Sequence, residues 1–234
     1  SPLLAHFDSG LWLPHIANVR NPRLLRALVQ AVEMLGVRYI KQADVVGWHS
    51  ETHRMTALET RDGQKYQADA FVVTAGAWTG QLLASLTIPM PVKPIKGQMI
   101  LYKLPTQQLA QIVLHQGHYL IPRQDGHILC GSTVEDTGFV KQTTAEALQL
   151  LTQSAERILP MLANYTPIGH WAGLRPASPN GIPFIGRVPQ FANLWVNAGQ
   201  FRNGLVLAPA SAQLLVDLMQ GNTPQINPQP YQVF

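Results

Sequence analysis

Residues 170–221 read HWAGLRPASPNGIPFIGRVPQFANLWVNAGQFRNGLVLAPASAQLLVDLMQG, and the fold can be inferred outward from them. Within this stretch a short apolar run, Leu194–Ala198, leads into Gly199, and a helical pattern begins near Leu205. A strand, a glycine turn and a helix in that order can direct backbone N–H groups at an electron-rich ligand. An ordinary strand-to-helix connection is the alternative, because two glycines before a helix are common. The stretch predicts α/β structure with a candidate ligand site at this turn.

Two arginines of the same stretch are candidates for binding a carboxylate. Arg175 lies in GLRP and Arg202 in FRNG. The planar guanidinium group donates two parallel hydrogen bonds to a carboxylate. Pro176 favours an extended backbone at Arg175, and an extended residue at the end of a strand can project into a cleft. A surface arginine paired with a nearby acidic residue is the alternative interpretation.

Composition limits the class of protein. The 234 residues are 46% apolar and 13% charged, with a net charge of +4 that is spread without runs. This charge is too weak and diffuse to indicate a nucleic-acid or membrane-surface partner. A single cysteine excludes an internal disulfide and favours a reducing compartment, so we expect the cytoplasm. We find no leader peptide and no membrane span. The low charge content also leaves room for subunit contacts, as in a homo-oligomer.

The first 90 residues alternate between helix and strand signals. Asn21 can cap a helix with Pro22 in its first turn, and the periodic apolar run that follows ends at Gly36, so a helix is predicted here. Ala77–Leu86 is a second helical segment. Between and around them, runs rich in β-branched residues predict short strands: Val37–Ile40, Val45–Trp48, Met55–Thr60, Gln64–Gln67 and Ala70–Thr74.

From about residue 91 the pattern changes to longer strands separated by turns. A helix is expected from Thr143, with a capping box to Glu146. The expected strands are Val92–Leu104, Ile112–Arg123, His127–Thr133 and Thr166–Trp171. We therefore predict an α/β (α+β) fold with two domains. Residues 1–90 and 171–234 form a discontinuous α/β domain, and residues 91–170 form an antiparallel sheet with a covering helix.

Other reactive side chains of the middle block have simple interpretations. His115 and His118 are three apart on one expected strand and so face opposite sides, and neither HExxH nor CxxC occurs. No metal site is expected. Cys130 is interpreted as a small core residue. Tyr119, in HYLIPR, either donates a hydrogen bond to a substrate carboxylate or packs on the covering helix.

Several segments together resemble one enzyme family. They are FVVTAGAWT (71–79), PVKPIKGQM (91–99), HYLIPR (118–123), WAGLRPASPNGIPFIG (171–186) and AGQFRNGLVLAPASAQLLVDLMQG (198–221). In residue types and spacing the chain resembles the D-amino-acid oxidase family of FAD-dependent oxidoreductases. Within it, the glycine oxidases of thiamine biosynthesis are most similar. The resemblance covers nearly the whole chain.

The resemblance implies roles for particular residues. Arg175 would hold the substrate carboxylate, Tyr119 would assist, and Arg202 would lie beside substrate and flavin. The residues implied in binding FAD are Val45, Ala75, Gly76, Gly199, Gln200, Phe201, Arg202, Asn203, Gly204, Leu205 and Val206. The implied reaction is oxidative deamination of glycine or another small amino acid or amine. Hydride passes from Cα to FAD, and dioxygen reoxidises the flavin to give hydrogen peroxide.

One motif of the family is missing from this sequence. The family begins with a strand followed by GxGxxG, which binds the FAD pyrophosphate, and no such sequence occurs here. We therefore expect an incomplete Rossmann-like FAD-binding domain that needs a further N-terminal segment or chain and binds FAD weakly alone. The chain would be part of a truncated oxidase or one chain of a split enzyme. A flavin dehydrogenase with another electron acceptor and a non-catalytic scaffold remain open alternatives.

Overall fold

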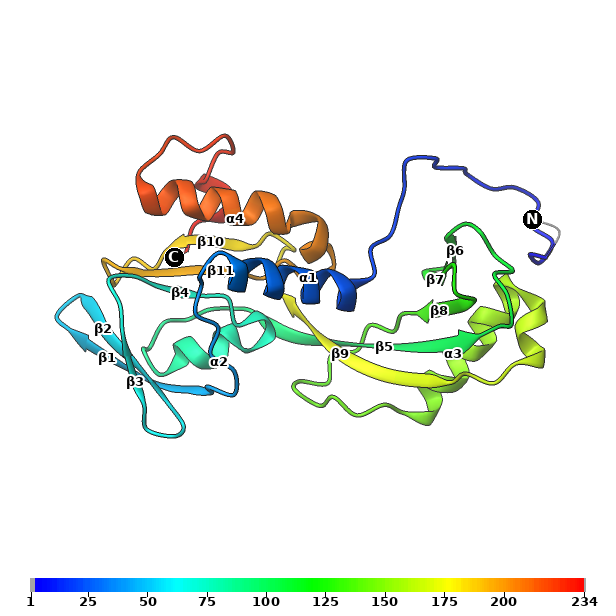
Figure 1. Ribbon diagram of the computed structural model, residues 1–234, viewed down its shortest axis with the longest axis horizontal. Helices are drawn as coiled ribbons and strands as arrows, with labels where there is room; N and C mark the ends of the chain where they lie inside the picture. Colours follow the sequence, from blue (N-terminus) through cyan, green and yellow to red (C-terminus); the bar gives the residue numbers. More distant parts are fainter. Residues whose placement is uncertain (1–2, 234) are drawn as a thin grey trace. The chain divides into compact units, whose positions relative to one another are not determined.

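The computed structural model describes residues 3–233, and these form two compact units (Figure 1). The first unit contains the chain up to Lys41 together with Gly97–Glu135 and Lys141–Gly173. The second contains Gln42–Lys96, Asp136–Val140 and the chain from Leu174 onward. Among the described residues, no helix is long and apolar enough to cross a membrane. The predicted domain boundaries differ from this division mainly in where they place residues 3–41, and they remain a prediction.

The first unit is built on a five-stranded sheet with the order β6-β7-β8-β5-β9. Helix α3, Ala145–Ile158, packs Leu151 and Ala155 into one core with Leu120 and Cys130 of the sheet. The strands are β5 (Lys93–Lys103), β6 (Val113–His115), β7 (His118–Pro122), β8 (His127–Gly131) and β9 (Gly169–Ala177). The predicted antiparallel sheet with a covering helix is confirmed. The N-cap of α3 is Thr144, one residue after the predicted cap, and its Oγ1 accepts a hydrogen bond of 3.2 Å from the Ala147 N–H.

The predicted strand over Ile112–Arg123 is wrong in its middle, where a hairpin divides it. Gln116 and Gly117 adopt positive φ angles of 47° and 80°, which glycine in particular allows. His115 of β6 consequently pairs directly with His118 of β7 across the hairpin. The two histidines are cross-strand neighbours, not residues of one strand facing opposite sides.

The second unit contains two three-stranded sheets. In one, β11 (Leu194–Ala198) lies between β10 (Phe184–Arg187), which is antiparallel to it, and β4 (Phe71–Val73), which is parallel. The continuous apolar runs of β4 and β11 supply much of the core, with Leu83 of α2 packed against them. The other sheet and the helices are β1 (Val45–Glu51), β2 (Arg54–Thr60), β3 (Lys65–Gln67), α2 (Thr79–Ala84) and α4 (Gly204–Gln220).

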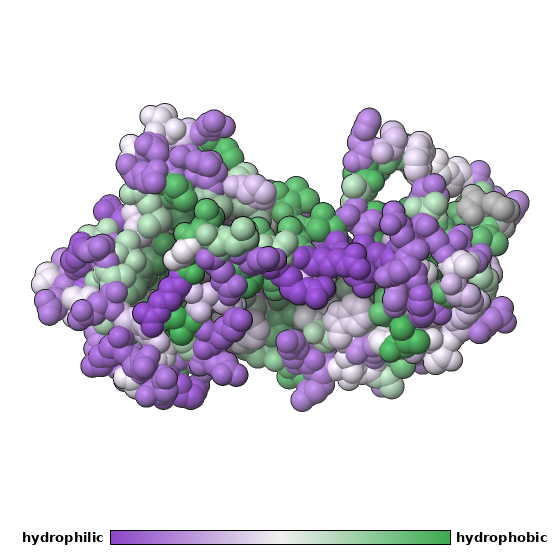
Figure 2. Space-filling model, viewed as in Figure 1, coloured by the Kyte–Doolittle hydropathy of each residue, from purple (hydrophilic) through white to green (hydrophobic). Residues whose placement is uncertain are grey.

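The N-terminal part of the first unit leaves much apolar surface open. Helix α1, Asn21–Met34, forms as predicted, but none of its residues is buried. Val37–Ile40, predicted as a strand, has no regular structure, because no neighbouring strand within residues 3–233 pairs with its backbone. Leu25 and Met34 keep 64% and 81% of their surface exposed. Figure 2 shows apolar patches among hydrophilic residues on the face that it draws.

Candidate functional site

All but one of the predicted site residues lie in the second unit. Arg175 is near the end of β9, and the turn from Gly199 to Val206 joins β11 to α4. Val45 begins β1, and Ala75 precedes the 3-10 turn Gly76–Trp78. Tyr119 belongs to β7 of the first unit. Apart from Tyr119, the predicted site residues therefore belong to one compact unit.

Gly199 makes a turn that no other residue fits well. Its φ is +88°, and a Cβ built there would lie 3.1 Å from the Cβ of Ser178. The next residue, Gln200, forms a β-bridge with Ala177 at the end of β9. Because side chains alternate along a strand, Arg175 projects from the same face of β9 as Ala177. The bridge thus ties the strand that carries Arg175 to the glycine turn.

The N-terminus of α4 presents both hydrogen-bond donors and apolar side chains. The 3-10 turn Phe201–Asn203 leads into the helix, whose N-cap Asn203 makes no side-chain capping bond. The first turn of α4 also contains no acidic residue. Its N–H groups and the positive end of the helix dipole are therefore not satisfied by these side chains. Leu205 and Val206 keep 43% and 81% of their surface exposed. Such a surface suits a flat conjugated ring with a partly negative edge.

A second part of the predicted cofactor site forms a cavity of about 470 Å³ in the second unit. Val45 and Ala75, from segments 30 residues apart, line it together with Trp78 and Leu82. The Trp48 Nε1–H donates a hydrogen bond of 3.1 Å to the Leu82 carbonyl oxygen, which links β1 to α2 beside this cavity. The residues present therefore fit the extended, partly apolar group that FAD would place here.

Tyr119 lies on the face of the large sheet that does not contact α3. Its neighbour Leu120 belongs to the core formed with α3, so alternation places Tyr119 on the opposite face. There the phenol Oη lies 4.0 Å from Sδ of Met99. It also lies 3.0 Å from where a Cβ would be on Gly131. Tyr119 thus sits over Met99 and Gly131 and does not pack on the covering helix.

The sequence does not identify two buried polar residues, Gln98 and Ser178. Gln98 is fully buried in β5, and Ser178 is 8% exposed beneath the Gly199 turn. The Oγ of Ser178 has no hydrogen-bond partner among the described residues. Gln98 lies in PVKPIKGQM, one of the segments that carry the resemblance, but nothing in the sequence indicates which groups it bonds. The only sequence signal at Ser178 is a small polar residue that follows the Arg175-Pro176 pair.

Metal-ligating side chains and the single thiol form no further reactive cluster among residues 3–233. Within residues 3–233 no group of three or more His, Cys, Asp or Glu side chains could hold a metal ion. Cys130 is fully buried in the core, as expected, and burial raises its pKa to about 12.

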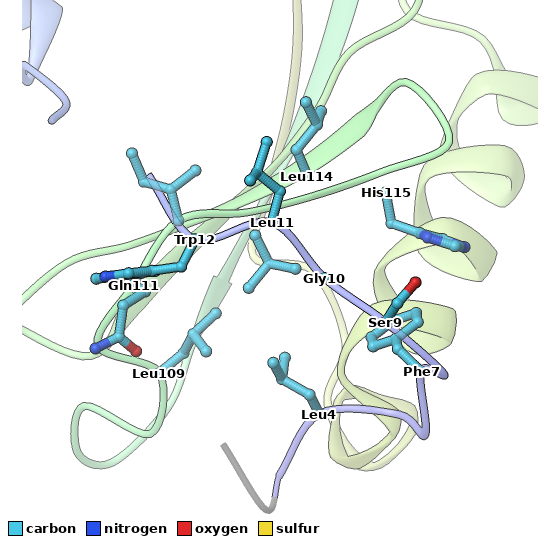
Figure 3. A pocket seen from close by; sticks show the side chains of 12 residues that line it. Leu4, Phe7, Ser9, Gly10, Leu11, Trp12, Leu109, Gln111, Leu114 and His115 are labelled. Atoms are coloured by element: carbon cyan, nitrogen blue, oxygen red, sulfur yellow. The ribbon is translucent and has the colours of Figure 1, made fainter. Parts of the chain in front are cut away.

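The first unit has a cavity of about 660 Å³ that is separate from the predicted site residues (Figure 3). The N-terminal segment contributes Leu4, Phe7 and Trp12 to it, and the chain around β6 contributes Leu109 and His115. The rings of Phe7 and His115 are 4.9 Å apart. The cavity is mainly apolar and contains none of the residues implicated in substrate or cofactor binding.

Comparison with known proteins identifies the family. The family model of FAD-dependent oxidoreductases (DAO) matches residues 1–218. A glycine oxidase of Pseudomonas aeruginosa is 49% identical over 97% of this chain, and the chain spans 62% of that relative. The crystal structure of iminodiacetate oxidase from Chelativorans sp. BNC1 has a similar fold, with a TM-score of 0.83 at 32% identity. The match covers 90% of this chain and 58% of that one.

The glycine oxidase of Geobacillus kaustophilus has a similar fold, with a TM-score of 0.83 at 27% identity. The match covers 91% of this chain and 57% of that one. The chain thus spans less than two thirds of the length of each of these relatives. The family model and the close relatives agree with the resemblance seen in the sequence. The chain belongs to the DAO family of FAD-dependent oxidoreductases.

Proposed function

We propose that this chain forms the substrate-binding part, and a portion of the FAD-binding part, of an oxidase for glycine or another small amino acid or amine. The observation that carries the proposal is the bridge between Ala177 and Gln200. It joins the strand of Arg175, a carboxylate-binding side chain, to the turn that leads into the open N-terminus of α4. The similarity to glycine oxidases supports a small amino acid as the substrate.

In this proposal Arg175 binds the substrate carboxylate through two parallel hydrogen bonds and so fixes the orientation of Cα. Arg202, exposed in the 3-10 turn before α4, adds positive charge beside the same turn. Tyr119 donates a further hydrogen bond to the carboxylate. No side chain acts as a strong base in this scheme, because binding the substrate as the free amine removes the need for one.

FAD, when bound, would accept a hydride from Cα, and dioxygen would reoxidise it to give hydrogen peroxide. The residues of this chain contribute binding and electrostatics. The N–H groups at the start of α4, which no side chain caps, would stabilise negative charge on a ring bound beside them. Leu205 and Val206 exclude water from the ring surface. The cavity lined by Val45 and Ala75 receives the adenosine end.

We further propose that a dinucleotide-binding segment, in the same polypeptide or in a second chain, completes the FAD site. Two features support this: α1 buries none of its residues, and Val37–Ile40 has no strand partner among residues 3–233. The isolated chain should therefore bind FAD weakly, as measured by titration of flavin fluorescence. A stoichiometric yellow complex of this chain alone would contradict the proposal. A location in the cytoplasm and a homo-oligomeric state stay predictions.

The direct test of the proposed activity uses the complete enzyme with glycine, sarcosine and D-alanine. Wild-type protein should release hydrogen peroxide with at least one of them. Arg175→Ala should raise KM about 30- to 700-fold, since losing a charged, hydrogen-bonded contact costs about 2–4 kcal/mol. Arg187→Ala is the matched control, because Arg187 is an exposed arginine of the same unit at the end of β10.

An Arg175→Ala enzyme with unchanged KM would refute the assignment of Arg175. Oxygen uptake measured with and without an artificial electron acceptor separates an oxidase from a dehydrogenase. If turnover required the acceptor, the oxidase assignment would be replaced by the dehydrogenase alternative. If no amino acid reduced the flavin, the alternative of a non-catalytic scaffold would replace the proposed activity.

A further inference from the structure

A buried network of hydrogen bonds centres on Gln98, whose side chain is completely inaccessible to solvent. Its Nε2–H donates to Oε1 of Glu135 at 2.9 Å and to Oγ1 of Thr144 at 3.3 Å. Its Oε1 accepts from the backbone N–H of Thr144 at 2.9 Å. A single amide thereby joins β5 to the N-cap of α3 and to the segment that follows β8.

The backbone of Gln98 holds the same segment a second time. Its N–H donates to Oγ1 of Thr133 at 2.8 Å, and the Thr133 N–H donates to the Gln98 carbonyl oxygen at 3.3 Å. The Thr133 hydroxyl in turn donates to the Glu135 carboxylate. Both ends of the three-residue stretch from Thr133 to Glu135 are therefore fixed to one residue of β5.

The residues next to this network form the surface beneath Tyr119. Met99 follows Gln98 directly in β5, and Gly131 lies two residues before Thr133 at the end of β8. Gly131 pairs with Met99 on one side and with Tyr119 on the other. The phenol Oη is 4.0 Å from Sδ of Met99, and a Cβ on Gly131 would lie 3.0 Å from it. A shift of β8 against β5 would move this surface and the phenol with it.

We propose that Gln98 is a positioning residue for Tyr119, acting through the anchored segment Thr133–Glu135 and the Met99–Gly131 pair. The inference rests on the proposed function, in which Tyr119 assists Arg175 in binding the substrate carboxylate. Gln98 itself touches neither substrate nor cofactor in this scheme. Removing its amide should weaken substrate binding, because Tyr119 is displaced. This effect comes in addition to the loss of stability that removing any buried amide causes.

The second unit supplies a matched control in Asn193, a buried amide with similar bonding. Asn193 is 4% exposed, accepts from the Met55 N–H at 2.8 Å and donates to the carbonyl oxygens of Met55 and Asp69 at 2.9 and 3.0 Å. Its side-chain hydrogen bonds reach Met55 and Asp69, and neither residue is assigned to the site. Asn193→Leu and Gln98→Leu both remove a buried amide, and the two should lower the melting temperature to a similar degree.

The experiment is a double-mutant cycle in the flavin-loaded enzyme. Gln98→Leu should raise KM about 3- to 10-fold in the wild-type background, the scale of one or two hydrogen bonds. In a Tyr119→Phe background the same substitution should change KM less than about twofold, because the coupled group is gone. Asn193→Leu should have the same small effect on KM in both backgrounds. An equal effect of Gln98→Leu in the two backgrounds would overturn the proposal.

A charge swap keeps the test informative if Gln98→Leu does not fold. Gln98→Glu alone places two carboxylates together and should raise KM, with the defect shrinking as the pH is lowered. Adding Glu135→Gln restores a donor–acceptor pair and should return KM to within about twofold of wild type, as expected for a coupled pair. Failure of the double variant to recover would also overturn the proposal.

A spectroscopic readout separates this inference from the proposed activity. With tyrosine labelled at the ring Cζ by ¹³C, the Tyr119 resonance should shift in Gln98→Leu and stay in place in Asn193→Leu. If the wild-type enzyme oxidises no amino acid, the proposed function fails, but this shift still decides whether Gln98 positions Tyr119. An unchanged Tyr119 resonance in Gln98→Leu would refute the positioning role.

Discussion

Helices α1 and α3 have the same length, 14 residues, but differ in what packs against their apolar residues. Helix α3 buries five residues against the large sheet, whereas α1 buries none. The ends differ too, since α3 has a Thr144 cap, Glu146 in its first turn and Arg157 in its last, and α1 has no equivalent of these. Similar helical periodicity thus leads to very different packing. Periodicity predicts that a helix forms, and tertiary contacts decide how much it stabilises.

The largest expected contrast between the two helices comes from truncating one leucine in each. Leu151 of α3 is completely buried, while Leu28 of α1 is 53% exposed. Leu151→Ala should lower the free energy of unfolding by about 2–5 kcal/mol, through lost burial and the cavity left behind. Leu28→Ala should change it by no more than about 0.5 kcal/mol. Urea unfolding of this chain followed by circular dichroism measures both values.

The same pair of variants sharpens the comparison in the complete protein. If a further segment covers α1 there, Leu28→Ala becomes more destabilising and the difference between the two helices narrows. An unchanged small effect of Leu28→Ala would mean that α1 stays exposed in the complete protein as well.

A smaller contrast is expected at the helix N-termini. Thr144→Ala should destabilise by about 1 kcal/mol, because the capping bond to the Ala147 N–H is lost. Thr144→Ser keeps the hydroxyl and should recover most of that loss. Asn21→Ala in α1 is the control: Asn21 was the predicted cap, but the structure makes Arg20 the N-cap with no side-chain bond. If Asn21→Ala lowered the free energy of unfolding as much as Thr144→Ala does, the two helix N-termini would not differ in capping.

Elements whose signals are local could be predicted from the sequence. The apolar run at β4 forms a buried strand, and two neighbouring predicted strands form as β2 and β3, joined by a turn in which Gly63 has a φ of +81°. Val37–Ile40 has the residue types of a strand but lacks a partner, and strand formation depends on that partner. The division of Ile112–Arg123 depends on a turn at Gln116-Gly117, and a single glycine between two strand-like runs does not by itself distinguish a turn from a continuous strand.

The candidate site rests partly on residue chemistry and partly on the resemblance. Residue types and spacing indicated Arg175, Tyr119, Gly199 and the start of α4, and the resemblance added their roles together with Val45, Ala75 and Gly76. The bonds of Gln98 could not be foreseen, because they reach residues 35 to 46 positions away in the sequence. A buried polar side chain is satisfied by whatever the fold brings to it, so its partners follow from tertiary structure.

The buried thiol of Cys130 has a practical consequence for studying this chain. Reaction with alkylating reagents requires an accessible thiolate, and Cys130 is neither accessible nor readily ionised. It is also the single cysteine of the sequence. A cysteine introduced at an exposed position such as Val206 would therefore be the one reactive thiol of the folded chain. A fluorescent or spin label placed there would report directly on the start of α4, without first removing a native cysteine.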